Sequence, residues 1–342
     1  MGLSTALSAA VSGLTAAQTR ATTVANNIAN ANTDGYVRRT TNVNERIVGG
    51  QGVGVDVTSI GRQTANFLTS ERMRFGAENA FSSEQATSAS RIADLLGDPG
   101  IQDGLFGAYA RFENSLRDAA ATPESSVLQR EVVDNANDIV RQFQTLSEQS
   151  ARLRTQADTD IGRAVTEVND ALQRLEELNG IGGESLTPDV LDERQRLVDR
   201  INDIIPVRAQ NVGDSLNLST EGGVVLLAQD AQLIEFSPAV LVTRNQSLGN
   251  GLSGLTVAGT DITPTGSGSQ AVQGGRIAAL FETRDERLPA FNDSIDALAA
   301  DLVIRFADDS VDPSKPAGEV GLFTAGAPTL PAPAPGGVVD YN

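Results

Sequence analysis

Apolar side chains recur at a regular spacing along the first 31 residues. Between Leu3 and Ile28 the steps from one apolar position to the next alternate between four and three, and no proline interrupts them. This spacing predicts one helix with a heptad seam, the pattern by which helices pack side by side. The seam consists of Leu3, Leu7, Ala10, Leu14, Ala17, Ala21, Val24 and Ile28.

The other faces of this predicted helix carry small or polar residues, and Arg20 is the only charged residue before Asp34. A helix with so narrow an apolar stripe is marginal on its own and needs a packing partner. No complementary partner is evident within the chain, so we expect the seam to pack mainly against other molecules. Packing within the chain remains the alternative.

The segment from Asn30 to Gly35 ends the helix, because Asn and Gly adopt the left-handed backbone conformation that stops helical hydrogen bonding. Residues 36–62 read as extended chain, with a turn at 49–52 and alternating valines after it. Residues 49–54 are glycine-rich like a phosphate-binding loop. No helix or lysine follows them, so we interpret them as a turn.

Helical spacing returns in four later segments, at residues 65–96, 105–121, 124–178 and 188–205. Pro123 suits the first turn of the third helix. That helix is on the order of 80 Å long, or else it is two pieces hinged near Gly162. We expect the apolar register of residues 124–205 to pack within the chain.

From residue 206 the apolar period shortens to two, which predicts a β-rich insert over residues 206–275. Helical spacing returns at 277–302, where Pro289 starts or kinks the helix. Residues 313–342 hold six of the 13 prolines and read as extended linker. Within the insert, strands are expected near 216–218, 224–227, 233–236 and 240–242.

The predicted fold class is mainly α with a β-rich insert, in an elongated multi-domain rod of long heptad-type helices. The expected parts are an N-terminal axial helix with an extended connector, a helical middle domain, a β-rich outer domain, a helix returning to the middle domain, and a Pro/Ala/Gly-rich start of a further outer region. Their bounds are 1–62, 63–205, 206–275, 276–312 and 313–342.

Composition excludes several kinds of site. The chain has neither His nor Cys, so the usual zinc, haem and thiolate sites are absent, and a net charge of -18 disfavours nucleic acid and anionic lipid. Apolar runs are too short for a membrane helix, and the start lacks the basic and apolar regions of a cleaved signal peptide. Asp158 and Asp160 lack the later ligands of a calcium loop, and we interpret them as a solvated helix face. We therefore predict no metal, no cofactor, no nucleic-acid partner and no membrane insertion.

Carboxylate catalysis is the chemistry that this composition leaves open. Asp98 with Asp103, or Asp308 with Asp309, are pairs of the kind that flank a glycosidic bond. In a chain with 44 acidic residues, solvated and helix-capping roles are the better interpretation. No catalytic residue is predicted.

The end of the N-terminal helix carries a recognisable signature. The run from Ala25 to Tyr36, preceded by the run from Ser12 to Gln18, resembles the N-terminal signature of the bacterial flagellar axial proteins. These include rod, hook and hook-associated proteins. The residues that carry the resemblance are Asn26, Asn27, Asn30, Asn32, Thr33, Gly35 and Tyr36.

Later segments are similar to one branch of these proteins, the hook-associated protein 1 family of first hook–filament junction proteins. The long helical segment 124–205 differs from hook protein, which is β-rich soon after its N-terminal helix. Two residues depart from the family pattern: Arg39 stands where Gln is frequent and Ala65 where Asp is common. The similar segments are 52–62, 67–68, 191–198, 274–277 and 318–323.

The resemblance implies a non-catalytic structural protein, exported by the flagellar type III apparatus without a cleaved signal peptide and located outside the cell at the hook–filament junction. Its implied partners are further copies of itself in a ring or helical oligomer, hook protein, the second hook–filament junction protein and the export apparatus. The seam would form the inner coiled-coil layer, and residues 26–36 would turn the chain outward.

Family members end in a C-terminal helix that pairs with the N-terminal one, whereas this sequence stops in its Pro-rich segment. We therefore expect a fragment, whose absent C-terminal region would bind an export chaperone. Three alternatives stay open: a hook or distal rod protein, a secreted adhesin, and a hydrolase that uses carboxylates alone.

Overall fold

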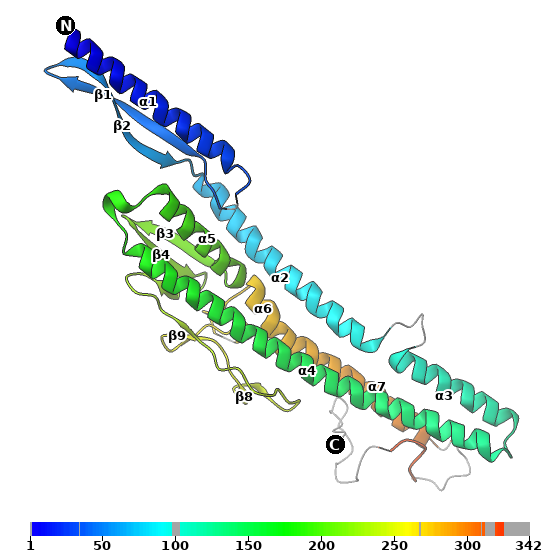
Figure 1. Ribbon diagram of the computed structural model, residues 1–342. Helices are drawn as coiled ribbons and strands as arrows, with labels where there is room; N and C mark the ends of the chain where they lie inside the picture. Colours follow the sequence, from blue (N-terminus) through cyan, green and yellow to red (C-terminus); the bar gives the residue numbers. More distant parts are fainter. Residues whose placement is uncertain are drawn as a thin grey trace.

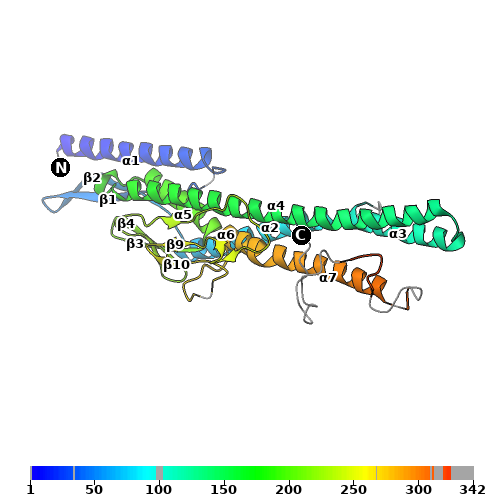
Figure 2. The same cartoon turned by 90° about the horizontal axis from the view of Figure 1, so that it is seen from below.

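The computed structural model describes residues 2–33, 35–97, 103–266, 268–308, 310–311 and 319–324. They form an elongated molecule, with a helix and a hairpin at one end, long helices running to the other end, and short strands along one side (Figures 1 and 2). The prediction of a mainly α fold with a β-rich insert is confirmed.

The N-terminal helix α1 (Leu3–Ala29) lies along a long β-hairpin (Figure 1). The hairpin is formed by β1 (Arg39–Val48) and β2 (Gln51–Arg62), which pair antiparallel. Gly49 and Gly50 form its turn with φ of 59° and 79°, a region that favours glycine. The predicted helix and turn are confirmed, and the extended connector is a two-stranded hairpin.

The remaining helices run close to the long axis of the molecule. A short 3₁₀ turn, Gly183–Ser185, precedes α5, whose first turn is capped by the Thr187 side chain. A π-helical turn, Thr283–Arg287, joins the last two helices. The helices are α2 (Asn66–Leu96), α3 (Gly104–Ala121), α4 (Ser126–Asn179), α5 (Pro188–Ile204), α6 (Gly275–Glu282) and α7 (Leu288–Ala307).

Helix α4 is one unbroken helix of 54 residues, so the alternative of two pieces hinged at Gly162 is wrong. Gly162 is instead a point of close packing, because a Cβ there would lie 3.6 Å from the Pro238 ring. The expectation for Pro123 is also wrong. The side chain of Ser125 caps the helix, and Pro123 lies in the turn before it.

The β-rich segment consists of small sheets. In the first, the strand order is β3–β4–β5, all antiparallel; the second has the order β10–β9–β6; and β7 pairs with β8 in parallel. The predicted strand at 240–242 is absent: Val240 is fully exposed in a loop. The strands are β3 (Val207–Val212), β4 (Ser215–Thr220), β5 (Val225–Leu227), β6 (Ile234–Glu235), β7 (Ser247–Leu248), β8 (Gly251–Leu252), β9 (Thr256–Val257) and β10 (Thr260–Asp261).

Within the described residues, two apolar clusters form along α4. The first joins the C-terminal half of α4 to α5, α6 and the strands, with Ile161, Leu172 and Leu218 at its centre. The second joins the N-terminal half of α4 to α3 and α7, and there the rings of Phe112 and Phe306 lie 5.6 Å apart. The apolar register of α4 therefore packs within the chain. The strands share a core with the helices, whereas the proposed division into domains stays a prediction.

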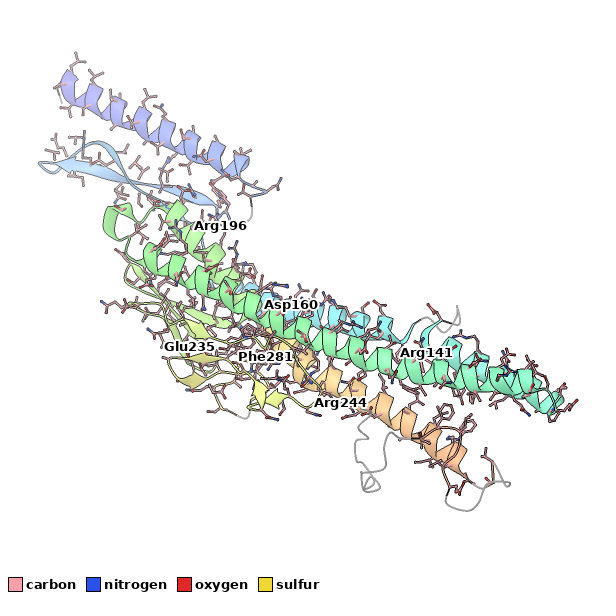
Figure 3. All side chains as sticks on the ribbon, turned by 60° about the horizontal axis from the view of Figure 1, so that its bottom comes forward. Arg141, Asp160, Arg196, Glu235, Arg244 and Phe281 are labelled. Carbon is pink, nitrogen blue, oxygen red and sulfur yellow. The ribbon has the colours of Figure 1, made fainter. Side chains whose placement is uncertain are left out.

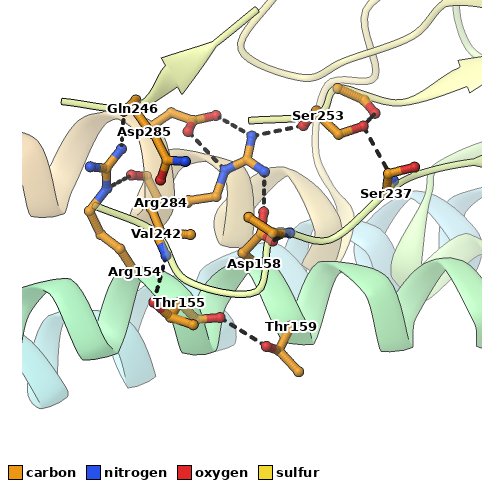
Figure 4. A network of polar contacts seen from close by, with 12 residues as sticks. Arg154, Thr155, Asp158, Thr159, Ser237, Val242, Gln246, Ser253, Arg284 and Asp285 are labelled. Carbon is orange, nitrogen blue, oxygen red and sulfur yellow. Dashed lines mark hydrogen bonds and ion pairs between the residues drawn. The ribbon is translucent and has the colours of Figure 1, made fainter. Parts of the chain in front are cut away.

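A polar network is buried where the β-rich segment crosses α4 (Figure 4). Arg284 is fully buried; its guanidinium donates to Asp158 Oδ1 at 2.5 Å and to both carboxylate oxygens of Asp285. Burial lowers the pKa of Arg284, but hydrogen bonds and charges from Asp285 and Asp158 outweigh it, so the pKa lies above its ordinary value. The expectation that Asp158 lies on a solvated face is wrong.

The π-helical turn explains how Arg154 joins this network. The Leu288 N–H bonds to the Thr283 carbonyl, and the next residue, Pro289, has no N–H for the carbonyl of Arg284. Arg154 Nε donates to that carbonyl at 2.8 Å, and its other nitrogens donate to carbonyls of residues 243, 244 and 246. Pro289 thus lies near the start of α7 and leaves an acceptor that Arg154 satisfies.

Candidate assembly surface

Helix α1 has two opposite faces with different roles. One faces the hairpin and is made of small or polar residues, while the predicted seam lies on the other. All but one of these contact positions follow a seam position by two residues, which is about 200° around a helix; the exception, Asn27, follows Val24 by three. The residues that are partly or fully buried on the hairpin side are Thr5, Ala9, Ser12, Ala16, Thr19, Thr23, Asn27 and Asn30.

All eight seam residues are exposed, including Ala10, Ala17 and Ala21. Leu3 and Ile28 are 89% and 72% exposed. A continuous apolar stripe on a helix of a folded chain marks an interaction surface. The hairpin leaves this apolar stripe uncovered. The packing of the stripe against other molecules stays a prediction.

Small side chains let the hairpin approach α1 closely. Ser12 Oγ accepts a hydrogen bond from the backbone N–H of Val55 at 3.1 Å, and Thr23 Oγ1 lies 2.9 Å from Thr41 Oγ1. Gly54 has a φ of 134°, and a Cβ there would lie 3.2 Å from the Ala9 Cα and clash with Ser12. The sequence held a signal for this face, since the positions two residues after the seam carry no large apolar side chain.

We expect Gly54→Ala to weaken the docking of the hairpin on α1 by about 1–3 kcal/mol, because the added methyl group overpacks the contact. The measurement is hydrogen exchange of the β1 and β2 amides, which should speed up. Gly13→Ala is the matched control, because a Cβ there meets nothing within 4 Å and should be neutral or stabilise α1. Equal exchange in the two variants would contradict this account of the contact.

The signature residues build the reversal of the chain between α1 and β1. Asn27 donates through Nδ2 to the Arg39 carbonyl and accepts the Arg39 N–H through Oδ1, both at 2.9 Å. The Tyr36 hydroxyl donates to the same Oδ1 at 2.9 Å. Asn27 therefore pairs with the first residue of β1 as a neighbouring strand would.

The other signature residues shape the turn itself. Asn30 donates to the carbonyl of Asn26 through its side chain, and Thr33 donates to Asn30 Oδ1 at 3.2 Å. Gly35 has a φ of 72°, the left-handed region that the sequence predicts for it. Asn32 is exposed. The structure brings five of the signature residues together at the C-terminal end of α1: Asn26, Asn27, Asn30, Thr33 and Tyr36.

The carboxylate candidates do not form a catalytic pair in the described part of the chain. Asp103 caps α3 by accepting the N–H of Gly104, as the helix-capping interpretation holds. Asp98 and Asp309 lie outside the described residues. No cluster of three or more potential metal ligands occurs within the described ranges. Among those ranges, too, no helix is long and apolar enough to cross a membrane.

The exposed seam and the hairpin thus belong to an elongated, mainly helical chain. Residues 7–36 match the family of flagella basal body rod proteins. Residues 89–308, well over half of the chain, match the family described as the flagellar hook-associated protein FlgK helical domain, and the chain belongs to this family. This family is structural and not enzymatic, as the resemblance implied.

Individual relatives agree with this membership. The flagellar hook-associated protein 1 of Salmonella typhimurium is 30% identical over 213 residues, which are 58% of this chain and 38% of the relative. The protein of the same name from Escherichia coli is 25% identical over 57% of this chain and 38% of its own length. The chain thus covers well under half the length of these relatives.

A solved structure supports the fold. The flagellar hook junction protein FlgK from Burkholderia pseudomallei superposes with a TM-score of 0.54 and 18% identity. The match covers 71% of this chain and 43% of the other.

Proposed function

We propose that the protein is a structural component of the bacterial flagellum that joins the hook to the filament. The observation that carries this proposal is the exposed seam of α1, on a chain that belongs to the hook-associated family. In assembly, the seams of neighbouring copies pack against axial helices and bury their leucines. Each large aliphatic side chain that becomes fully buried contributes about 1.5–3 kcal/mol to association.

The same proposal assigns the partners. The protein forms a ring or helical oligomer with itself and contacts hook protein on one side and the second hook–filament junction protein on the other. It leaves the cell through the type III export apparatus, aided by an export chaperone. Family membership supports the flagellar location, and the seam supports self-association.

The main alternative is a hook or distal rod protein, which would share the signature in residues 7–36. The match of the helical-domain family over residues 89–308 favours the junction role over this alternative. A secreted adhesin would use the same exposed surfaces to bind a target outside the flagellum.

Immunogold electron microscopy of purified hook–filament structures tests the proposal, with an antibody raised against residues 206–275. This segment offers the exposed edge strand β3 and the fully exposed Val240. We expect a single band of label where the hook meets the filament. Label along the whole hook or rod would overturn the junction role, and label away from an intact flagellum would favour the adhesin.

A further inference from the structure

The N-terminal unit, residues 3–62, meets the rod formed by helices α2 to α7 at the start of α5 (Figures 1 and 3). Arg39 is the first residue of β1 and Arg62 is the last residue of β2, and the two are paired across the base of the hairpin. Both side chains reach across to α5. They therefore connect the two strands of the unit to one helix of the rod.

The two arginines share one carboxylate. Arg39 Nη2 donates to Asp192 Oδ2 at 3.1 Å, while Arg62 Nε lies 2.7 Å from Asp192 Oδ1 as an ion pair. Arg39 also donates to Asp189 Oδ1 at 2.5 Å. Asp189 is widely exposed, with 77% of its side chain in solvent, whereas only 4% of the Asp192 side chain is exposed.

Burial distinguishes the contacts with Asp192 from the contact with Asp189. The Arg39 and Arg62 side chains are 13% and 12% exposed, so their pairing with Asp192 is shielded from salt far more than a surface pair would be. Burial lowers the pKa of Arg39, but hydrogen bonds to Asp189 and Asp192 outweigh it and leave the pKa raised. Without Asp192, the two arginines would lose the buried carboxylate that they share, and Arg39 would keep its contact with the exposed Asp189.

The surroundings link this contact to the signature turn. The Arg39 guanidinium lies 4.9 Å from the centre of the Tyr36 ring, and Tyr36 is held by Asn27. On the other side, Gly35 abuts the stem of Arg196 on α5, and any Cβ at Gly35 would clash with it. Figure 3 shows Arg196 at the end of the rod that faces the hairpin.

We propose that Asp192, held between Arg39 and Arg62, is a clamp that sets the angle between the N-terminal unit and the rod. The chain between the N-terminal unit and the rod is short, residues 63–65. It keeps the unit next to the rod but does not fix the angle between them. Because Asp192 contacts arginines from both strands, the N-terminal unit cannot rotate about one of these contacts without disturbing the other. This device goes beyond the assembly role and does not depend on it, because it acts within a single chain.

Distances between spin labels in the full chain test the clamp. The sequence has no Cys, so two introduced cysteines, Thr22→Cys on α1 and Gln173→Cys on α4, are labelled specifically. Both positions are exposed. With Asp192 present we expect one narrow distance distribution by double electron–electron resonance. Asp192→Asn should make it about twice as wide or add a second distance, because removing a stabilising contact populates other states.

Asp189→Asn is the matched control, since it removes only the exposed partner of Arg39 and should leave the distribution narrow. The double variant Arg39→Gln with Arg62→Gln should reproduce the effect of Asp192→Asn, and circular dichroism checks that each variant keeps its helices. An unchanged distribution in folded Asp192→Asn or in the double variant would overturn the clamp. Equal broadening in Asp189→Asn would overturn the assignment to Asp192.

Discussion

Replacing Leu7, Leu14 and Ile28 together with Asp should abolish incorporation of the protein into the flagellum while its fold remains intact. These side chains are 65–72% exposed, so the substitutions remove almost no packing within the chain. In an assembled seam, each new carboxylate would be buried without a partner, at a cost of several kcal/mol. The measurements are motility and recovery of the variant with purified hook–filament structures, in a strain that lacks the wild-type protein.

The matched control places the same three charges on another face of α1. Ser4, Thr15 and Thr22 are exposed and lie roughly 110–130° around the helix from the seam. Their replacement with Asp should leave incorporation much less affected, and both variants should show the helix content of the wild type. Normal incorporation of the seam variant would refute intermolecular packing through these residues.

Asp158→Ala should destabilise the rod by about 3 kcal/mol, the lower end of the cost of breaking a buried ion pair, because Arg284 keeps Asp285 as a partner. Arg284 would lose the Asp158 carboxylate, and the Ala239 N–H, which donates to Asp158 Oδ2 at 2.6 Å, would lose its acceptor. The measurement is the shift of the urea unfolding midpoint, followed by circular dichroism. We expect the segment 237–253, which includes β7 and β8, to lose protection from hydrogen exchange first.

Asp160→Ala is the control for this experiment. Asp160 lies two residues away on α4 (Figure 3). It pairs with the exposed Arg163 on the same helix, an arrangement worth about 0–1 kcal/mol. A double variant, Asp158→Leu with Arg284→Met, should recover part of the lost stability, because it removes the buried charge of Arg284 together with that of Asp158. The recovery is incomplete because Asp285, whose side chain is 10% exposed, loses Arg284. Similar unfolding midpoints for Asp158→Ala and Asp160→Ala would contradict the assigned role of the network.

Local signals in the sequence were sufficient to predict where most helices begin and end. The bounds of α2 and α5 are predicted to within about two residues, since Gly97 ends the first and the Thr187–Pro188 cap begins the second. The seam of α1 and the hairpin turn are likewise local patterns. The strand β3 and the loop at 240–242 were not predicted, because short strands depend on contacts with distant residues more than on their own period.

The buried role of Asp158 depends on a partner 126 residues away, which no local pattern shows. A faint signal existed, since the apolar register of α4 takes a single step of four and four through Leu153, Ala157 and Ile161, beside Arg154 and Asp158. The clamp at Asp192 was equally hidden. Its three charged residues lie in different elements, and only the fold brings them together.

The unbroken α4 converts a small tilt at one end of the molecule into a large displacement at the other. At about 1.5 Å per residue the helix is about 80 Å long, so a tilt of roughly 10° at its end near α5 moves its far end by about 14 Å. The loop between α3 and α4 lies at that far end (Figure 2). Small changes of angle where the N-terminal unit meets the rod are therefore amplified into displacements wider than a helix at the opposite tip.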